Sequence, residues 1–95
     1  MQSKDKLAQK IANFIIADGT ANTESGTWNI TFEEIVNQMV DAVLTEDIIA
    51  AIADNIIAIL EAHDAVGEAC LDADCFEVAF WDEYCAGGPR YTPPE

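Results

Sequence analysis

Apolar residues recur at helical spacing near the start of the chain. Four of them share one face of a helix: Leu7, Ile11, Phe14 and Ile15. Ser3 can cap this helix, and Gly19 follows as a stop signal. The pattern predicts a helix from Ser3 to about Ala17. A small, polar segment over 20–27 then indicates a surface loop.

The next helix has the clearest start signal. In Thr31-Phe32-Glu33-Glu34, the Thr31 hydroxyl can accept from the Glu34 amide while the Glu34 carboxylate reaches back, which forms a capping box. We expect a second helix from Phe32 to about Leu44. Its buried stripe is predicted to be Phe32, Val36, Met39 and Val43.

The apolar stripe changes phase after Leu44. It continues at Ile49, Ile52, Ile56 and Ile59. The shift predicts a break at Thr45, which can cap a third helix from Glu46 to about His63. One long, bent helix is the alternative. The third helix is apolar on most sides, which is typical of a helix that is central in a bundle or shared between subunits.

The last third of the chain allows two interpretations. Asp74-Cys75-Phe76-Glu77 resembles a second capping box, which predicts a helix from Cys75 to about Ala86, ended by Gly87-Gly88. The alternative is a strand over 75–81 in which apolar residues alternate, paired with the extended segment 26–30. We favour the helix. The proline-rich end predicts an extended tail.

Together these elements predict an all-α fold, a compact bundle of about four helices. A chain of 95 residues has room for one core, so we expect a single domain over 1–88 and a tail over 89–95. No apolar run approaches the roughly 18 residues that a membrane span needs. The first ten residues lack the apolar stretch of a secretory signal, and we therefore expect a cytoplasmic protein.

The net charge of the chain says more about its function than its hydrophobic composition does. The chain has 18 Asp and Glu against 4 Lys and Arg, a net charge of −14. No Lys or Arg lies between residues 11 and 89, whereas all acids except Asp5 and Glu95 do. The field of such carboxylates extends about 8 Å at physiological salt, far enough to act on a docking partner. It argues against direct binding to nucleic acid or to an anionic membrane.

Some of the acidic residues recur at a spacing of seven positions. Asp47, Asp54 and Glu61 would line one edge of the third helix about 10 Å apart, with Glu68 continuing the spacing. Rows of carboxylates can occupy a groove of Lys and Arg that is built for phosphates. The alternative is the ordinary solvated edge of a helix. The full predicted partner-binding set is Asp47, Asp54, Glu61, Glu68, Asp72, Asp74, Glu77, Asp82 and Glu83, with Tyr84 and Tyr91 as aromatic anchors.

The sequence carries no catalytic motif and no metal motif. His63, Cys70, Cys75 and Cys85 have the spacing H-x6-C-x4-C-x9-C, without the close C-x2-C pair of a zinc finger. We predict buried thiols, no metal, no cofactor and no enzymatic activity. Whether any of the cysteines pair is open at this point. The two tryptophans, Trp28 and Trp81, are predicted to lie in the core.

One short acidic domain with a cation-free stretch from residue 11 to 89 resembles the small inhibitors that bacteriophages carry, namely anti-CRISPR and DNA-mimic anti-restriction proteins. The resemblance implies a non-enzymatic inhibitor that occupies the nucleic-acid-binding site of a basic protein complex in a bacterial host. Acidic immunity proteins that neutralise nuclease toxins are similar on the same grounds. A different alternative is a homodimeric scaffolding subunit, whose seam would be Ile49, Ile52, Ile56 and Ile59.

Overall fold

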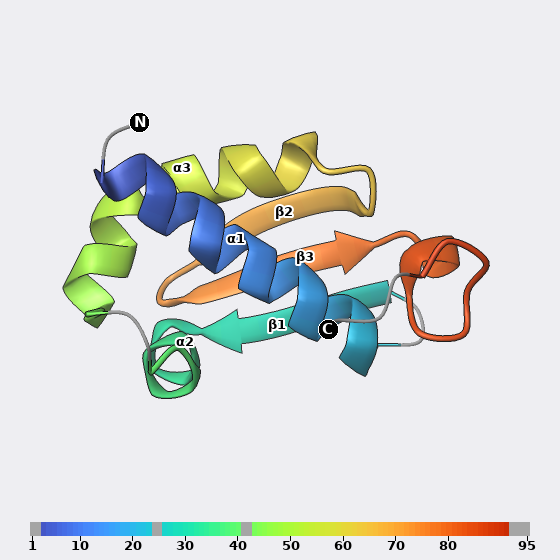
Figure 1. Cartoon of the computed structure of the whole chain (residues 1–95), viewed down its shortest axis with the longest axis horizontal. Helices are drawn as coiled ribbons and strands as arrows, with labels where there is room; N and C mark the ends of the chain where they lie inside the picture. Colours follow the sequence, from blue (N-terminus) through green and yellow to red (C-terminus); the bar gives the residue numbers. More distant parts are fainter. Residues whose placement is uncertain (1–2, 24–25, 41–42, 92–95) are drawn as a thin grey trace.

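The structure is a computed structural model that describes residues 3–23, 26–40 and 43–91. A single sheet lies behind a layer of helices (Figure 1). The elements, in chain order, are α1 (Ser3–Asn22), β1 (Gly26–Thr31), α2 (Phe32–Gln38), α3 (Glu46–Ala62), β2 (Val66–Asp72), β3 (Cys75–Phe80) and the short 3-10 helix η1 (Asp82–Tyr84). Among the described helices, none combines the length and the apolar composition that a membrane-spanning helix needs.

The last third of the chain forms strands, so the predicted all-α bundle is wrong and the fold is α+β. β3 is the central strand of an antiparallel sheet with the order β1-β3-β2. Phe76, Val78 and Phe80 are buried while the residues between them are half-exposed, the period-2 pattern of a strand covered on one face. The predicted fourth helix fails because Asp74 lies in the turn of the β2–β3 hairpin and caps no helix.

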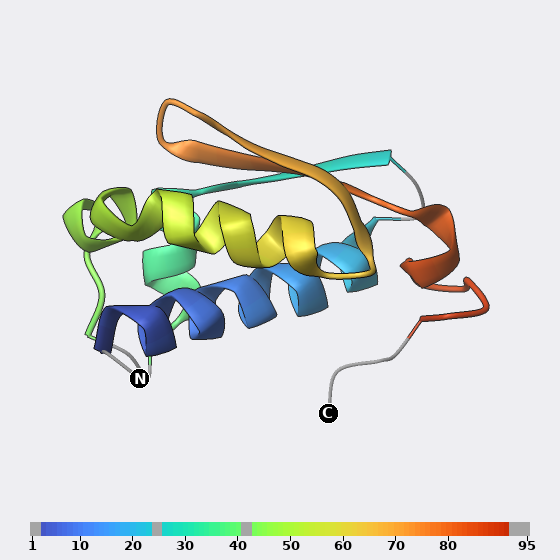
Figure 2. The same ribbon diagram turned by 90° about the horizontal axis from the view of Figure 1, so that it is seen from above.

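The helices cover one face of the sheet. α1 and α3 lie side by side on that face, and no described element covers the opposite face (Figure 2). The stripe predicted for α3 faces this shared core, where Ile49, Ile52 and Ile56 are buried within a single chain. The third helix is confirmed almost to the residue, and Thr45 caps it by accepting a hydrogen bond from the Ile48 amide at 3.2 Å.

α1 continues through Gly19 to Asn22, beyond its predicted end at Ala17. Gly19 is buried, and a Cβ at this position would lie 2.6 Å from Cζ of Phe80 and closer still to its Cε2. The glycine is therefore needed for close packing of α1 on β3 and does not end the helix. Near this end of α1, Thr20 Oγ1 donates to the carbonyl of Ile16 at 2.6 Å.

α2 is shorter than predicted. The capping box is confirmed: Thr31 Oγ1 accepts from the Glu34 amide at 3.1 Å, and Glu34 Oε1 accepts from the Thr31 amide at 3.2 Å. The helix nevertheless ends at Gln38, and Val43, predicted to be buried, is 92% exposed. Residues 43–45 are not helical, which rules out one long helix across this region.

The chain after β3 folds back on itself. The Ala86 amide donates to the Thr20 carbonyl at 2.9 Å, which ties this segment to the end of α1. The Arg90 amide donates to the Glu83 carbonyl at 2.8 Å, so residues 89–91 lie against η1. The rest of the predicted tail, residues 92–95, lies outside the described residues.

Candidate protein-interaction surface

The predicted acidic stripe lies on the solvent side of α3. Asp47, Asp54 and Glu61 are all exposed, and their spacing of seven residues places them about 10 Å apart along the helix. Glu68 does not continue this row, because the helix ends at Ala62 and Glu68 belongs to β2.

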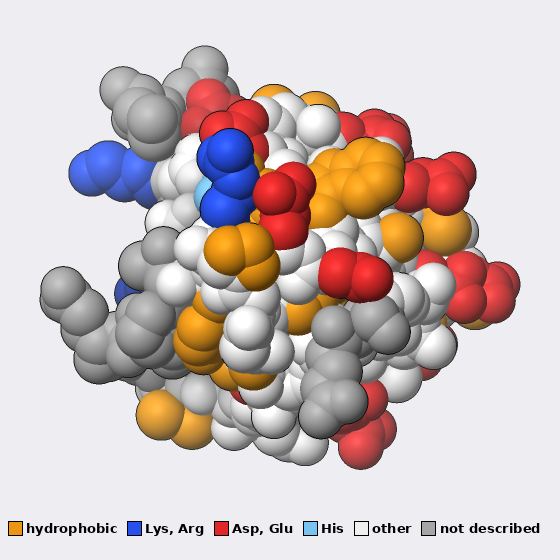
Figure 3. Space-filling view, turned by 90° about the vertical axis from the view of Figure 1, so that its right-hand side faces the viewer, with side chains coloured by type: hydrophobic (Ala, Val, Ile, Leu, Met, Phe, Trp, Pro, Cys, Tyr) orange, Lys and Arg blue, Asp and Glu red, His pale blue; other side chains and the backbone are white. Residues whose placement is uncertain are grey.

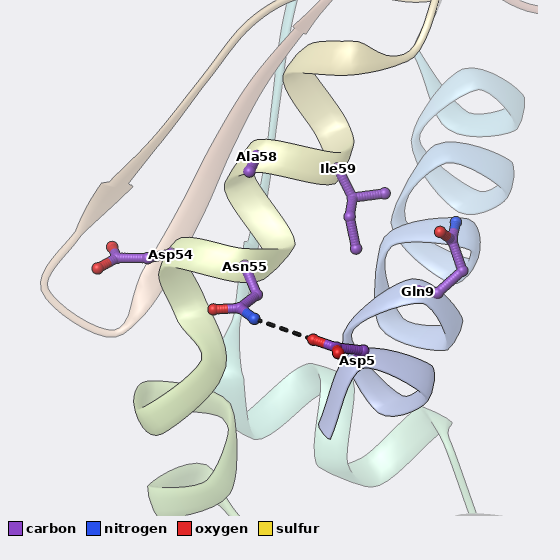
Figure 4. A pocket seen from close by; sticks show the side chains of 6 residues that line it. All are labelled: Asp5, Gln9, Asp54, Asn55, Ala58 and Ile59. Carbon is purple, nitrogen blue, oxygen red and sulfur yellow. Dashed lines mark hydrogen bonds between the residues drawn. The ribbon is translucent and has the colours of Figure 1, made fainter. Parts of the chain in front are cut away.

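The helical layer that carries this stripe also contains lysines, on α1. α1 runs beside α3 in the same direction, and Asn55 Nδ2 donates to Asp5 Oδ1 at 3.4 Å across the helix pair. Lys6 and Lys10 are exposed on the same helical layer. The helical layer is therefore not free of cations, although Asp54 points away from α1 on the far side of α3 (Figure 4).

A groove of about 500 Å³ lies between α1 and α3. Its lining is Asp5, Gln9, Asp54, Asn55, Ala58 and Ile59. Asp5 and Asn55 point toward each other within it, whereas Asp54 points away from Asp5 on the other side of α3 (Figure 4). The two carboxylates do not converge on one point, so the groove offers no paired acidic site.

The uncovered side of the sheet carries three more of the predicted acidic residues, Glu68, Asp72 and Glu77. We call it the open face, and it consists of Thr27, Asn29, Glu68, Cys70, Asp72, Cys75, Glu77 and Ala79. Pairing places Cys70 opposite Glu77 and Glu68 opposite Ala79. A shallow hollow of about 240 Å³ runs across the three strands. It is lined by Thr27, Glu68, Cys70, Glu77 and Ala79.

The thiols on the open face report its negative charge. Cys70 Sγ donates to Glu77 Oε2 at 3.6 Å. The pKa of Cys70 is raised by loss of hydration, by this hydrogen bond and by the charges of Glu77, Glu68 and Asp72. The pKa of Cys75 is also raised, first by desolvation and then mainly by Glu77 and Asp74. Both groups are therefore held as thiols, which disfavours nucleophilic chemistry at this surface.

No Lys or Arg belongs to any of the three strands. In the end-on view of Figure 3, acidic side chains with hydrophobic ones among them follow the side of the molecule formed by the sheet. Lys and Arg are seen in the middle and on the side of the helices. The strands of the open face thus contain no cation, whereas the helical layer that carries the α3 stripe contains Lys6 and Lys10.

Trp81 lies beside the open face, and the prediction that it belongs to the core is wrong. It follows buried Phe80, so the alternation of β3 directs its side chain to the opposite side of the sheet. A Cβ at Gly67 would lie 3.2 Å from the indole ring, and the side chain is 56% exposed. Extending the alternation by one residue past Phe80 would have found this aromatic in the sequence.

The remaining predicted residues lie at the two ends of the sheet. Asp74 is in the hairpin turn, whereas Asp82 and Glu83 are in η1 beyond the other end of β3. Glu83 Oε2 pairs with Arg90 Nε at 3.1 Å, and the Arg90 guanidinium lies 6.0 Å from the Tyr84 ring centre. Tyr84 and Tyr91 are half-buried. Arg90 therefore offsets the charge of Glu83 and covers part of Tyr84, which leaves this end less suited to a basic partner.

All three cysteines are free, and only Cys85 is fully buried. Within the residues that the structure describes, no three His, Cys, Asp or Glu side chains gather as a metal site. Comparison of the chain with protein-family models, with curated proteins and with solved structures found no match.

Proposed function

We propose that this protein is a non-enzymatic acidic inhibitor that binds a basic, nucleic-acid-binding site on a partner protein. The observation that carries the proposal is the open face of the sheet. Glu68, Asp72 and Glu77 stand there on paired strands that contain no Lys or Arg. The frame is ordered, so the carboxylates reach a partner without a large loss of backbone entropy on binding.

The spacing suits a surface that normally holds phosphates. Glu68 and Asp72 are four residues apart on β2, about 13 Å at strand geometry. Glu77 lies on the neighbouring strand opposite Cys70, diagonal to both and about 8 Å from each. Lys and Arg side chains that contact a nucleic-acid backbone respond to charge and not to base identity. A row of fixed carboxylates can satisfy them, and association should be fast and sensitive to salt.

The test is affinity capture from a lysate of the cells in which the protein occurs, at low and at high salt. We expect a Lys- and Arg-rich nucleic-acid-binding protein that salt releases, and that loses its DNA or RNA when this protein is added. A single captured nuclease toxin would indicate the immunity-protein alternative. A captured partner that keeps its nucleic acid in the presence of saturating inhibitor would contradict the proposal.

A matched pair of variants connects the captured partner to charge. Glu68→Gln with Glu77→Gln removes two charges from the open face while keeping side-chain size, and capture should weaken strongly. Folding should be unaffected, because Glu68 is exposed and Glu77 is only half-buried. Thermal unfolding of the variant checks this directly, and a rise in melting temperature is expected because self-repulsion falls.

A further inference from the structure

The open face offers an aromatic ring and carboxylates close together, and this combination favours a guanidinium group over other cations. Trp81 is 56% exposed, and its indole ring packs against Gly67, where the absence of a side chain leaves room for the ring. Glu68 follows Gly67 directly and is paired with Ala79, two residues before Trp81. An aromatic surface and a carboxylate are therefore neighbours at one end of the hollow.

The rest of the hollow extends this arrangement along the sheet. Glu77 lies two residues before Ala79 on the same face of β3, and its carboxylate accepts a hydrogen bond from Cys70 Sγ at 3.6 Å. Thr27 on β1 closes the far side. The charged groups that line the hollow are the carboxylates of Glu68 and Glu77, so the hollow offers charged acceptors and no charged donor among its lining residues.

A guanidinium group fits these contacts better than an ammonium group does. Its planar surface stacks on tryptophan, and its fork of N–H donors pairs with carboxylates. An ammonium group can pair with the carboxylates but makes a weaker contact with the ring. The aromatic therefore adds a preference that carboxylates alone do not give.

Other occupants conflict with the charge of this surface. Nucleic acid and anionic lipid are repelled by the carboxylates. Two copies of the chain placed face to face would bring Glu68, Asp72 and Glu77 of each against the same residues of the other, without a cation from the strands to separate them. A basic protein segment is the occupant that the charges favour.

We propose that the open face, with Trp81 at its edge, is the docking surface for an arginine-bearing segment of the partner protein, one arginine stacking on Trp81 and pairing with Glu68 while the next reaches Glu77. This assignment rests on the proposed function and names the part of the molecule that performs it. The acidic stripe of α3, which belongs to the helical layer on the other side of the sheet (Figure 2), then contributes only a long-range field.

The test uses a defined probe, a short peptide of alternating arginine and glycine, and its lysine counterpart of equal length and charge. Titration of the isotope-labelled protein, followed by amide and indole NMR signals, gives both the affinity and the location. We expect shifts at Glu68, Cys70, Glu77 and the Trp81 indole, and about threefold tighter binding of the arginine peptide. Trp81→Leu should reduce this preference to near unity and leave binding of the lysine peptide almost unchanged.

Two double variants, which remove equal charge from the open face and from α3, show which of the two surfaces binds the peptide. Glu68→Gln with Glu77→Gln should weaken the arginine peptide about fivefold, because two exposed ion pairs are lost. Asp54→Asn with Glu61→Gln, an equal loss of charge on α3, should weaken it less than twofold. All four side chains are at least partly exposed, so both variants should fold.

The outcomes separate this assignment from the proposed function. Equal effects of the two double variants, or shifts confined to α3, would overturn the docking surface while leaving an acidic inhibitor intact. Retention of the arginine preference in Trp81→Leu would overturn the role of the indole. Absence of binding by either peptide at low salt would count against the electrostatic basis of the proposed function as well.

Discussion

Gly19 offers a sharp test of how α1 packs on the sheet. Replacing a glycine inside an exposed helix by alanine stabilises a protein by about 1 kcal/mol, because alanine loses less backbone freedom on folding. At Gly19 the added methyl group would lie 2.6 Å from Cζ of Phe80 and 3.1 Å from Cε3 of Trp28. Both rings belong to the packed core or its margin, so the methyl group has no free space to enter.

We expect Gly19→Ala to destabilise the protein. Inserting a methyl group into a filled core costs about 1 to 3 kcal/mol, which exceeds the gain in helix propensity. The net loss should be about 1 kcal/mol, or about 4 to 8 °C in melting temperature for a domain of this size. Urea denaturation followed by far-UV circular dichroism measures it, and the midpoint should fall while the slope is unchanged.

Phe80→Leu provides the control, because it removes the ring that the methyl group would approach most closely. In this background Gly19→Ala should be neutral or stabilising, which gives a coupling of about 1 to 2 kcal/mol between the two positions. Stabilisation of the otherwise native protein by Gly19→Ala would refute the close packing. An equal loss in both backgrounds would show that Phe80 is not its cause.

Three further changes test local features of the fold. Ala73 has a φ of 55° in the β2–β3 turn, so Ala73→Gly should stabilise by about 1 kcal/mol in urea denaturation; a loss would contradict the strain. Thr31→Ala removes the cap of α2 and should cost about 1 kcal/mol by the same assay, whereas Thr31→Ser should keep most of it. The pKa of Asp18 is raised mainly by desolvation and also by the charge of Glu34, against a lowering hydrogen bond from Asn22. The folded state therefore holds the Asp18 proton more tightly than the unfolded state does, so this group adds stability as pH falls through the raised pKa. Asp18→Asn should flatten that part of a profile of melting temperature against pH. An unchanged profile would contradict the raised pKa of Asp18.

Local signals in the sequence predicted the elements that depend on neighbouring residues. Thr45 and the isoleucine stripe fix α3, and the Thr31–Glu34 capping box fixes the start of α2. The caps act within one helical turn, and the stripe lies within one helix. The end of α2 was not predictable from the same pattern. The stripe could continue to Val43, but the chain leaves the helix at Met39, which is buried as its C-cap.

The sheet depends on contacts between distant residues. Asp74-Cys75-Phe76-Glu77 satisfies a helix start locally, but Phe76 is paired with Ile30 on one side and with Leu71 on the other. A strand that is central in a sheet is stabilised by both neighbours, and no local pattern contains the more distant one. The strand alternative over 75–81, paired with 26–30, was the correct interpretation of this region.

The candidate site was only partly predictable for the same reason. Linear order separates the lysines near residue 10 from the acids of α3, yet packing of α1 beside α3 brings them to one layer. The open face gathers Glu68, Asp72 and Glu77 by strand pairing, which their spacing along the chain does not show. Their exposure was predictable from charge, whereas their grouping required the register of the sheet.

The capping box that starts α2 also limits how the sheet can grow. The Phe32 amide donates toward β3, to the Asp74 carbonyl, so the alternation of an antiparallel strand turns the backbone groups of Thr27, Asn29 and Thr31 to the outer edge of β1. The Thr31 amide is already bound by Glu34. At this edge a foreign strand could thus form both backbone hydrogen bonds only with Thr27 and Asn29, because the Glu34 carboxylate and α2 follow. Two residues are too short a template for fibril growth.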